Sequence, residues 1–234
     1  MNTPDAIVAL LKAVPYFAGL SPDALKTLAA GCHSKSFGAG QVVFMEGDPC
    51  HHLYILESGR VKFCRMNAKG REQILRVFDR QGDTFCIPSA FSTERYIVNA
   101  MAMTGTRLRV LDVDRVNRLA QEHPSMALKL VATAGEHMAR LVTLAEDLSL
   151  KTVTARLAKY LCELAVAEGG DHHEEIRLSR DRLHEEELAS MLGTVRVHVS
   201  RSLMNLVRAR AIDLTRGFIR IHDLAVLREI SRGK

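Results

Sequence analysis

Two arginines near the C-terminal end of the chain have the type and spacing needed to read DNA bases. Residues 185–193 have the pattern of a short helix that ends at Gly193, and a second helical pattern follows up to Arg208. Arg196 and Arg201 lie on the polar face of that second pattern. An arginine on a helix in the major groove can donate two hydrogen bonds to O6 and N7 of guanine. The segment therefore predicts a DNA-reading helix-turn-helix.

Other side chains of the same face are expected to contact DNA. Ser200 and Thr194 carry short hydroxyl groups that suit phosphate oxygens, and Thr194 can also cap the second helix. Val197 can contact a thymine methyl group. The apolar stripe that would face inward comprises Val195, Val199, Leu203, Leu206 and Val207. The predicted DNA contacts are Thr194, Arg196, Val197, His198, Ser200, Arg201 and Asn205.

The rest of the C-terminal segment is basic and contains a predicted hairpin. Six arginines and one acid, Asp213, lie between positions 196 and 220. Residues 212–215 and 218–222 are predicted to be strands, and Asp223 to cap a last helix. This hairpin resembles the wing of a winged helix.

The segment that begins at Ser125 is predicted to pair two copies of the chain. Its apolar residues recur at alternating steps of four and three without a proline, which is typical of coiled-coil helices. An ordinary core helix has a wider apolar stripe. The predicted dimer seam is Ala127, Val131, Ala134, Met138, Leu141, Ala145 and Leu148.

The N-terminal half has the pattern of a small β-domain. Residues 6–11 and 22–30 are predicted helices, and Ser21 precedes Pro22 as an N-cap does. Short β-rich runs then alternate with glycine turns, which favours a sandwich or barrel. The predicted strands are 41–44, 53–57, 60–65, 73–78, 97–103 and 107–112.

Three further elements are predicted outside this β-domain and the helix-turn-helix. They are helices at 114–121 and 150–168 and a short strand at 176–178.

The composition and the motifs exclude several classes. The 234 residues carry a net charge of +5, and the five widely spaced cysteines contain no C-x-x-C pair, which argues against a disulfide framework and a closed zinc site. No apolar run is long enough to span a membrane, and no secretory signal begins the chain, so we expect a cytoplasmic protein without a membrane partner. Because H-E-x-x-H, G-x-S-x-G, P-loop and Rossmann motifs are missing, we expect no enzyme.

The order of these elements resembles the superfamily of the cyclic-AMP receptor protein and the fumarate-nitrate reduction regulator (CRP/FNR). The resemblance rests on Gly47-Asp48, residues 53–62, the run Gly82-Asp83-Thr84-Phe85, the long helix and residues 188–201. It implies an α+β fold with three parts: a β-roll sensor similar to cyclic-nucleotide-binding domains (1–123), a dimerisation helix (124–150) and a winged helix-turn-helix (151–234).

The resemblance also implies a mechanism. An effector in the roll would repack the long helices of a homodimer, so that its two reading helices enter successive major grooves of a palindromic site. In activating relatives, the loop equivalent to 167–177 contacts RNA polymerase. The alternative is a cyclic-nucleotide-type binding module or regulatory subunit without a transcriptional role, which would have no use for residues 188–201.

Several positions depart from the pattern of the family. Val197 replaces the usual glutamate, so we expect an altered half-site. Cys86-Ile87 replaces a glycine-glutamate pair and Arg95-Tyr96 an arginine-serine or arginine-threonine pair. Leu141 and Val142 replace hydroxyl residues, and these changes disfavour a cyclic nucleotide. An iron–sulfur cluster is disfavoured because Cys32 is the first cysteine.

The effector therefore has several candidates, with haem-linked gas or redox sensing favoured over cyclic AMP. Phe85-Cys86-Ile87-Pro88 resembles a segment of the haem-containing carbon-monoxide sensor of the family, so that Cys86 or His137 would be the metal ligand if haem binds. Cys86 could instead be a redox switch or a plain core residue. The predicted pocket residues are Phe85, Cys86, Ile87, Pro88, Arg95, Tyr96, His137, Met138 and Leu141.

Overall fold

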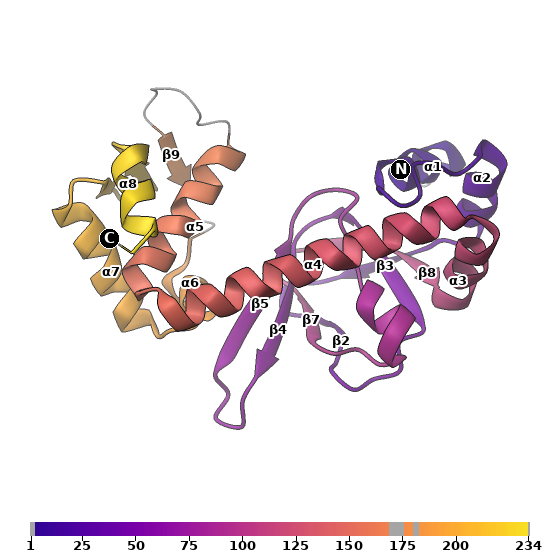
Figure 1. The fold of residues 1–234 in the computed structure, drawn as a ribbon, viewed down its shortest axis with the longest axis horizontal. Coiled ribbons are helices and arrows are strands. Elements are labelled where there is room, and N and C mark those ends of the chain that lie inside the picture. The colour runs from indigo at the N-terminus through magenta and orange to yellow at the C-terminus, as the bar shows by residue number, and fades with distance from the viewer. Residues whose placement is uncertain (1–2, 169–175, 180–182, 234) are drawn as a thin grey trace. The chain divides into compact units, whose positions relative to one another are not determined.

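The computed structural model describes residues 3–168, 176–179 and 183–233, and these form two compact units (Figure 1). The first comprises Met1–Arg65 with Leu75–Leu141, and the second Met66–Ile74 with Val142–Lys234. The division falls within the long helix. The three-part division at 123 and 150 stays a prediction.

The first unit begins with two helices, α1 (Pro4–Ala13) and α2 (Pro22–Ala30). Ser21 caps α2 as predicted, because its hydroxyl accepts a hydrogen bond from the Ala24 backbone amide at 3.2 Å. Leu11, Phe17 and Leu25 are fully buried between these helices and the neighbouring strands. The helices therefore close one side of the β-domain.

Eight strands follow, in two four-stranded antiparallel sheets with the orders β1-β8-β3-β6 and β2-β7-β4-β5. Their bounds are β1 (His33–Phe37), β2 (Val42–Phe44), β3 (His52–Ser58), β4 (Val61–Met66), β5 (Glu72–Phe78), β6 (Thr84–Phe85), β7 (Asn99–Ala102) and β8 (Thr106–Asp112). All six predicted strands are confirmed within a few residues. Two further strands were not predicted: β1, whose first four residues are exposed, and β6, which has only two residues.

The inner faces of the two sheets enclose an aromatic core. Phe44 stacks on Tyr96 with ring centroids 3.7 Å apart, and Tyr54 stacks on Phe85 at 5.4 Å. Between β6 and β7 the chain forms a one-turn π-helix, η1 (Ser89–Thr93). Turns of this kind occur often at functional sites.

Two helices follow the strands, and the second of them extends from the first unit into the second. Asp112 caps α3 (Val113–Glu122), and α4 (Pro124–Leu150) confirms the predicted long helix. Met126 and Leu130 bury α4 against the first unit, whereas Val131 and Met138 leave 69% and 67% of their surface exposed. Leu128 and Val142 widen this exposed apolar stripe beyond the predicted seam.

The second unit contains a helical core and a small sheet of order β10-β11-β9. Its elements are α5 (Val153–Ala167), β9 (Ile176–Ser179), α6 (Glu185–Met191), α7 (Arg196–Arg208), β10 (Ile212–Leu214), β11 (Phe218–Ile221) and α8 (Leu224–Ser231). Asp223 caps α8 as predicted. The predicted helix 150–168 is wrong at its start, because α4 ends at Leu150 and the Thr152 hydroxyl caps a new helix by accepting from the Ala155 amide.

Neither a candidate membrane span nor a cluster of metal-ligating side chains was found among the described residues. No helix among the described residues is long and apolar enough to cross a membrane, and no group of three or more metal-ligating side chains occurs in the same part of the chain. Most of the loop 167–177, which the resemblance assigned to polymerase contact, lies outside the described residues.

Candidate nucleic-acid interface and effector cavity

A glycine turn sets the angle between α6 and α7. Gly193 has a φ of +62°, a conformation in which a side chain is strained. The turn is closed by the Thr194 amide, which donates to the Ala189 carbonyl at 2.9 Å. This geometry confirms the predicted role of Gly193 and fixes where α7 begins.

Replacing Gly193 with alanine should destabilise the second unit. The new Cβ would lie 2.5 Å from Cδ2 of Leu148, in addition to a left-handed backbone cost of about 1–2 kcal/mol. At this chain length, thermal unfolding followed by circular dichroism should show a melting temperature lower by several degrees. The matched control is Gly217→Ala, because a Cβ at Gly217 meets nothing within 4 Å. Equal melting temperatures for the two variants would contradict this account of the turn.

The outer face of α7 carries most of the predicted DNA contacts. Arg196, Val197, His198, Arg201 and Asn205 are exposed. On the opposite face, Val199, Leu203 and Leu206 are buried in the core of the second unit. The helix is thus anchored by its buried apolar face and presents a polar, cationic face to solvent.

Two details of the predicted helix start are wrong. Val195, which was predicted to face inward, is 47% exposed. It occupies the N-cap position of α7, and its side chain makes no capping hydrogen bond. Thr194 is buried and does not cap α7; its Oγ1 lies 3.2 Å from Nδ1 of His198 instead. Thr194 therefore supports His198 from within the turn, which leaves its hydroxyl less accessible to a phosphate.

An acidic side chain of α6 accepts hydrogen bonds from two of the residues that are predicted to contact DNA. The Glu185 carboxylate accepts hydrogen bonds from Ser200 Oγ at 2.5 Å and from Arg196 Nε at 3.3 Å. Glu186 lies 3.9 Å from the same guanidinium group. Glu185 is thus a positioning residue that orients Arg196, and the sequence analysis did not find it because fifteen residues separate it from Ser200.

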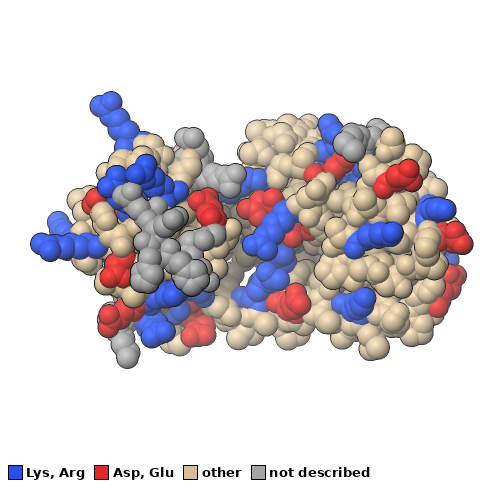
Figure 2. Space-filling view, turned by 90° about the horizontal axis from the view of Figure 1, so that it is seen from above, with Lys and Arg blue, Asp and Glu red and all other residues tan. Residues whose placement is uncertain are grey.

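The second unit also presents basic residues around its predicted wing. Strands β10 and β11 pair as an antiparallel hairpin, with Ile212 opposite Ile221, and Arg216 is exposed at its tip. Figure 2 shows several Lys and Arg side chains projecting from the left-hand part of the molecule, which is the second unit, among scattered acidic ones. This charge distribution suits a polyanionic partner.

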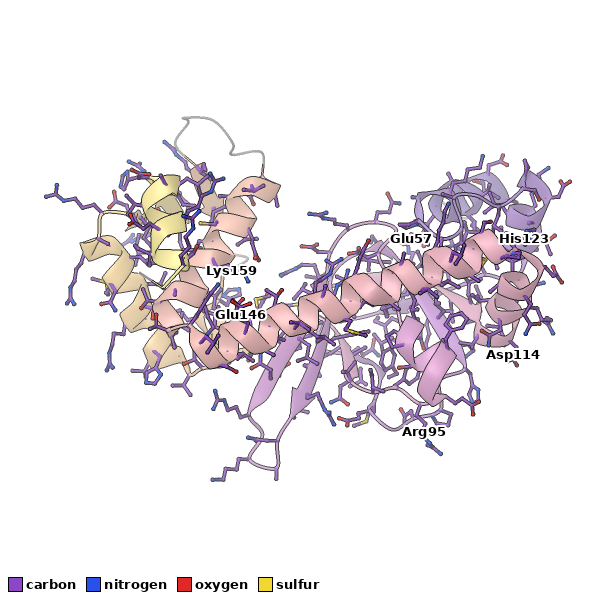
Figure 3. The ribbon with its side chains drawn as sticks, viewed as in Figure 1. Glu57, Arg95, Asp114, His123, Glu146 and Lys159 are labelled. Carbon is purple, nitrogen blue, oxygen red and sulfur yellow. The ribbon has the colours of Figure 1, made fainter. Side chains whose placement is uncertain are left out.

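The corner between α4 and α5 is fixed by charged groups. Arg156 Nη1 donates to the carbonyls of Asp147 and Leu148 at 3.2 Å and of Lys151 at 3.3 Å, which satisfies the free C-terminal end of α4. Burial would raise the pKa of the Asp147 carboxyl, but hydrogen bonds from Lys159 and Lys151 hold this pKa below its usual value. Lys159 is labelled in Figure 3. The last turn of α4 is therefore rigidly joined to α5.

The first unit contains a mostly apolar cavity of about 140 Å³ between the roll and α4. It brings together four of the predicted pocket residues: Cys86, Pro88, His137 and Leu141. The other lining residues were not predicted; they are Phe44, Phe63, Leu75, Arg76, Phe78, Ser89, Ile97, Val98 and Arg140. These come from strands, a turn and α4, and no local motif links them.

The other predicted pocket residues lie elsewhere, and the cavity is not built from them. Phe85 and Tyr96 are buried in the aromatic core, and Ile87 packs beneath the N-terminal helices. Met138 is exposed on α4. Arg95 lies at the surface (Figure 3), where its Nη1 donates to the Gly47 carbonyl at 2.7 Å.

Two ionisable groups of the cavity are uncharged near neutral pH. Burial raises the pKa of the Cys86 thiol well above its usual value. Burial and the charges of Arg76 and Arg140 lower the pKa of His137 to about 4. Cys86 also has a φ of +82°, the left-handed region that favours glycine, so the wall of the cavity contains a strained residue.

Comparisons with known proteins agree with both halves of this description. Residues 34–123 match the family described as Cyclic nucleotide-binding domain, and residues 155–230 match the Crp-like helix-turn-helix domain. The chain is 29% identical to a CRP-like cAMP-activated global transcriptional regulator of Mycobacterium tuberculosis over 93% of both chains. It is 27% identical to the Cyclic AMP receptor protein of Thermus thermophilus, over 95% of this chain and 99% of that protein.

Solved structures show the same fold. A CooA variant from Carboxydothermus hydrogenoformans superposes with a TM-score of 0.73 over 86% of this chain and 88% of its own, at 24% identity. At this identity, the likeness shows the fold alone.

Proposed function

Because the chain belongs to the CRP/FNR superfamily of transcription regulators, we propose that it is a homodimeric, sequence-specific DNA-binding regulator that acts in the cytoplasm and is controlled by a small effector in its β-roll. The observation that carries the proposal is the exposed face of α7, where Arg196 and Arg201 stand on a helix fixed by the Gly193 turn. A binding module or regulatory subunit without a transcriptional role would not require this face.

The exposed stripe of α4 supports the homodimer. Val131, Met138 and Leu128 are each more than two-thirds exposed in the single chain. Large exposed apolar side chains aligned on one helix are typical of a surface that a partner helix covers. A two-fold dimer would present two α7 helices to a palindromic site, whose half-sites lie about 34 Å apart. Contact with RNA polymerase through residues 167–177 is a further part of the proposal that rests on the family resemblance.

The cavity narrows the choice of effector. Its volume of about 140 Å³ is close to that of an apolar cavity that holds one benzene ring, which favours an effector smaller than haem. The protonated, buried Cys86 thiol is also a poor redox reagent, since thiol reactivity requires the thiolate. Cyclic AMP carries a purine, a ribose and a phosphate, which exceed the same space. We therefore propose that the effector is a small molecule that binds in this cavity.

Binding-site selection tests the function directly. The purified full chain is incubated with duplexes that contain a randomised stretch, and the bound DNA is sequenced after several rounds. We expect an inverted repeat whose half-sites are separated by about 10 base pairs, centre to centre. Selected DNA with no sequence enrichment over the input would contradict the proposal, and an enriched single half-site would contradict its dimeric part.

A further inference from the structure

The cavity combines an apolar interior with a cationic rim. Its interior is formed mainly by Phe44, Phe63, Phe78 and Val98, which offer no hydrogen bonds from their side chains. At its edge lie Arg76 of β5 and Arg140 of α4, with the neutral ring of His137 beside them. A ligand that satisfies both regions needs an apolar body and an anionic head.

The positive charges of the two arginines affect the same ionisable groups at the cavity. Each carries a charge close enough to lower the pKa of His137, and the charge of Arg140 together with burial also lowers the pKa of Arg76. The guanidinium of Arg76 lies over the Phe78 ring, 4.3 Å from its centroid, so it is held at the cavity. The acidic groups that face this cluster are Asp83 and Glu136, and Glu136 pairs with Arg140 at 3.5 Å in an exposed position. An anion bound between the arginines would relieve their mutual repulsion.

The volume limits the body of the ligand. About 140 Å³ is close to the size of the apolar cavity, about 150 Å³, that binds benzene. One six-membered ring therefore fills the interior, with its substituent directed to the rim. Carboxylate is the head group that suits a guanidinium pair, because arginine donates two parallel hydrogen bonds to it.

Two unusual backbone conformations occur in the same wall. Cys86 keeps a φ of +82° although a non-glycine residue there is strained, and its carbonyl accepts from the Ala90 amide at 2.8 Å at the start of η1. Strained residues and π-turns both cluster at binding sites. Ser89, the first residue of η1, also lines the cavity. The wall is thus built around the cavity at a conformational cost.

We infer that this cavity binds a monocyclic carboxylate, with its ring among the phenylalanines and its carboxylate between Arg76 and Arg140. The inference rests on the proposed function, in which the cavity is the effector site, and it specifies the chemical class of that effector.

Titration calorimetry with the full chain tests the inference, with benzoate as the probe. We expect benzoate to bind with one molecule per chain, toluene to bind as a neutral ring, and acetate to give no measurable binding. Arg76→Gln and Arg140→Gln should each weaken benzoate binding about tenfold and leave toluene binding unchanged. Arg80→Gln is the control, since Arg80 is exposed and outside the cavity lining. Because glutamine keeps much of the arginine stem, unchanged toluene binding also shows that the cavity is intact.

The inference is overturned if benzoate binds no better than acetate, if neither cavity arginine affects its binding, or if cyclic AMP displaces it with higher affinity. Affinity for the selected palindrome, measured on the same preparations, separates this result from the proposed function. A chain that binds the palindrome but not benzoate contradicts the ligand class alone. A chain that binds benzoate but no specific DNA contradicts the proposed function and leaves the ligand class standing.

Discussion

Met138→Glu should convert the protein to monomers and abolish its specific DNA binding at concentrations that saturate the wild-type chain. Met138 is 67% exposed in the single chain and lies in the middle of the apolar stripe of α4. Burying a methionine contributes about 1.5–3 kcal/mol, and a two-fold interface loses this contribution twice. Two unpaired carboxylates brought together at the seam add a further cost. The dissociation constant of the dimer should therefore rise by at least about a thousandfold.

Sedimentation equilibrium measures this change, and the structure offers a matched control. Ala132 is also exposed on α4 but lies outside the seam, so Ala132→Glu should remain a dimer. Because Met138 contacts solvent in the single chain, its replacement should leave the far-ultraviolet circular dichroism of the monomer unchanged. A Met138→Glu chain that stays dimeric would overturn the assignment of this stripe as the interface.

Arg201→Ala should reduce affinity for the selected palindrome far more than affinity for unrelated DNA. Arg201 is exposed on the outer face of α7, and we expect its guanidinium to contact a base edge. One arginine–guanine pair contributes about 1–3 kcal/mol, and a palindrome contains two such pairs, so the specific affinity should fall by about 30-fold or more. Non-specific binding depends on phosphate charge and should fall only slightly.

Fluorescence anisotropy with the palindrome and a scrambled duplex, at one salt concentration, measures both affinities. Arg118→Ala is the control, because Arg118 is an exposed arginine of α3 in the first unit. If both affinities of Arg201→Ala fall by the same factor, Arg201 contacts a phosphate and the assignment to a base is wrong.

Much of the fold could be predicted because its signals are local. The alternation of apolar residues and the glycine turns located six strands, and the step of four and three residues located α4. Gly193 could be predicted because a left-handed residue has few alternatives to glycine. The first four residues of β1 are all exposed, so it has no alternating pattern that could reveal it.

The sites were less accessible to sequence reasoning, since they depend on contacts between distant positions. Arg76 and Arg140 are 64 residues apart, and only the packing of α4 on the roll brings them to one cavity. Arg95 has the residue type of an anion ligand, but its own hydrogen bond to Gly47 holds it at the surface. Thr194 has the residue type of a cap, but the tight turn buries it beneath His198. The residue type indicated a possible interaction for Arg95 and for Thr194, but the tertiary structure determined which interaction each side chain makes.

Hydroxyl-radical footprinting of the selected palindrome tests the central claim most directly, because it reports how the dimer lies on DNA. The account predicts two protected stretches on each strand, related by two-fold symmetry and separated by about one helical turn of 10–10.5 base pairs. These positions correspond to two α7 helices in successive major grooves. A single protected stretch, or protection without the two-fold symmetry, would contradict a homodimer that reads DNA with both helix-turn-helix motifs.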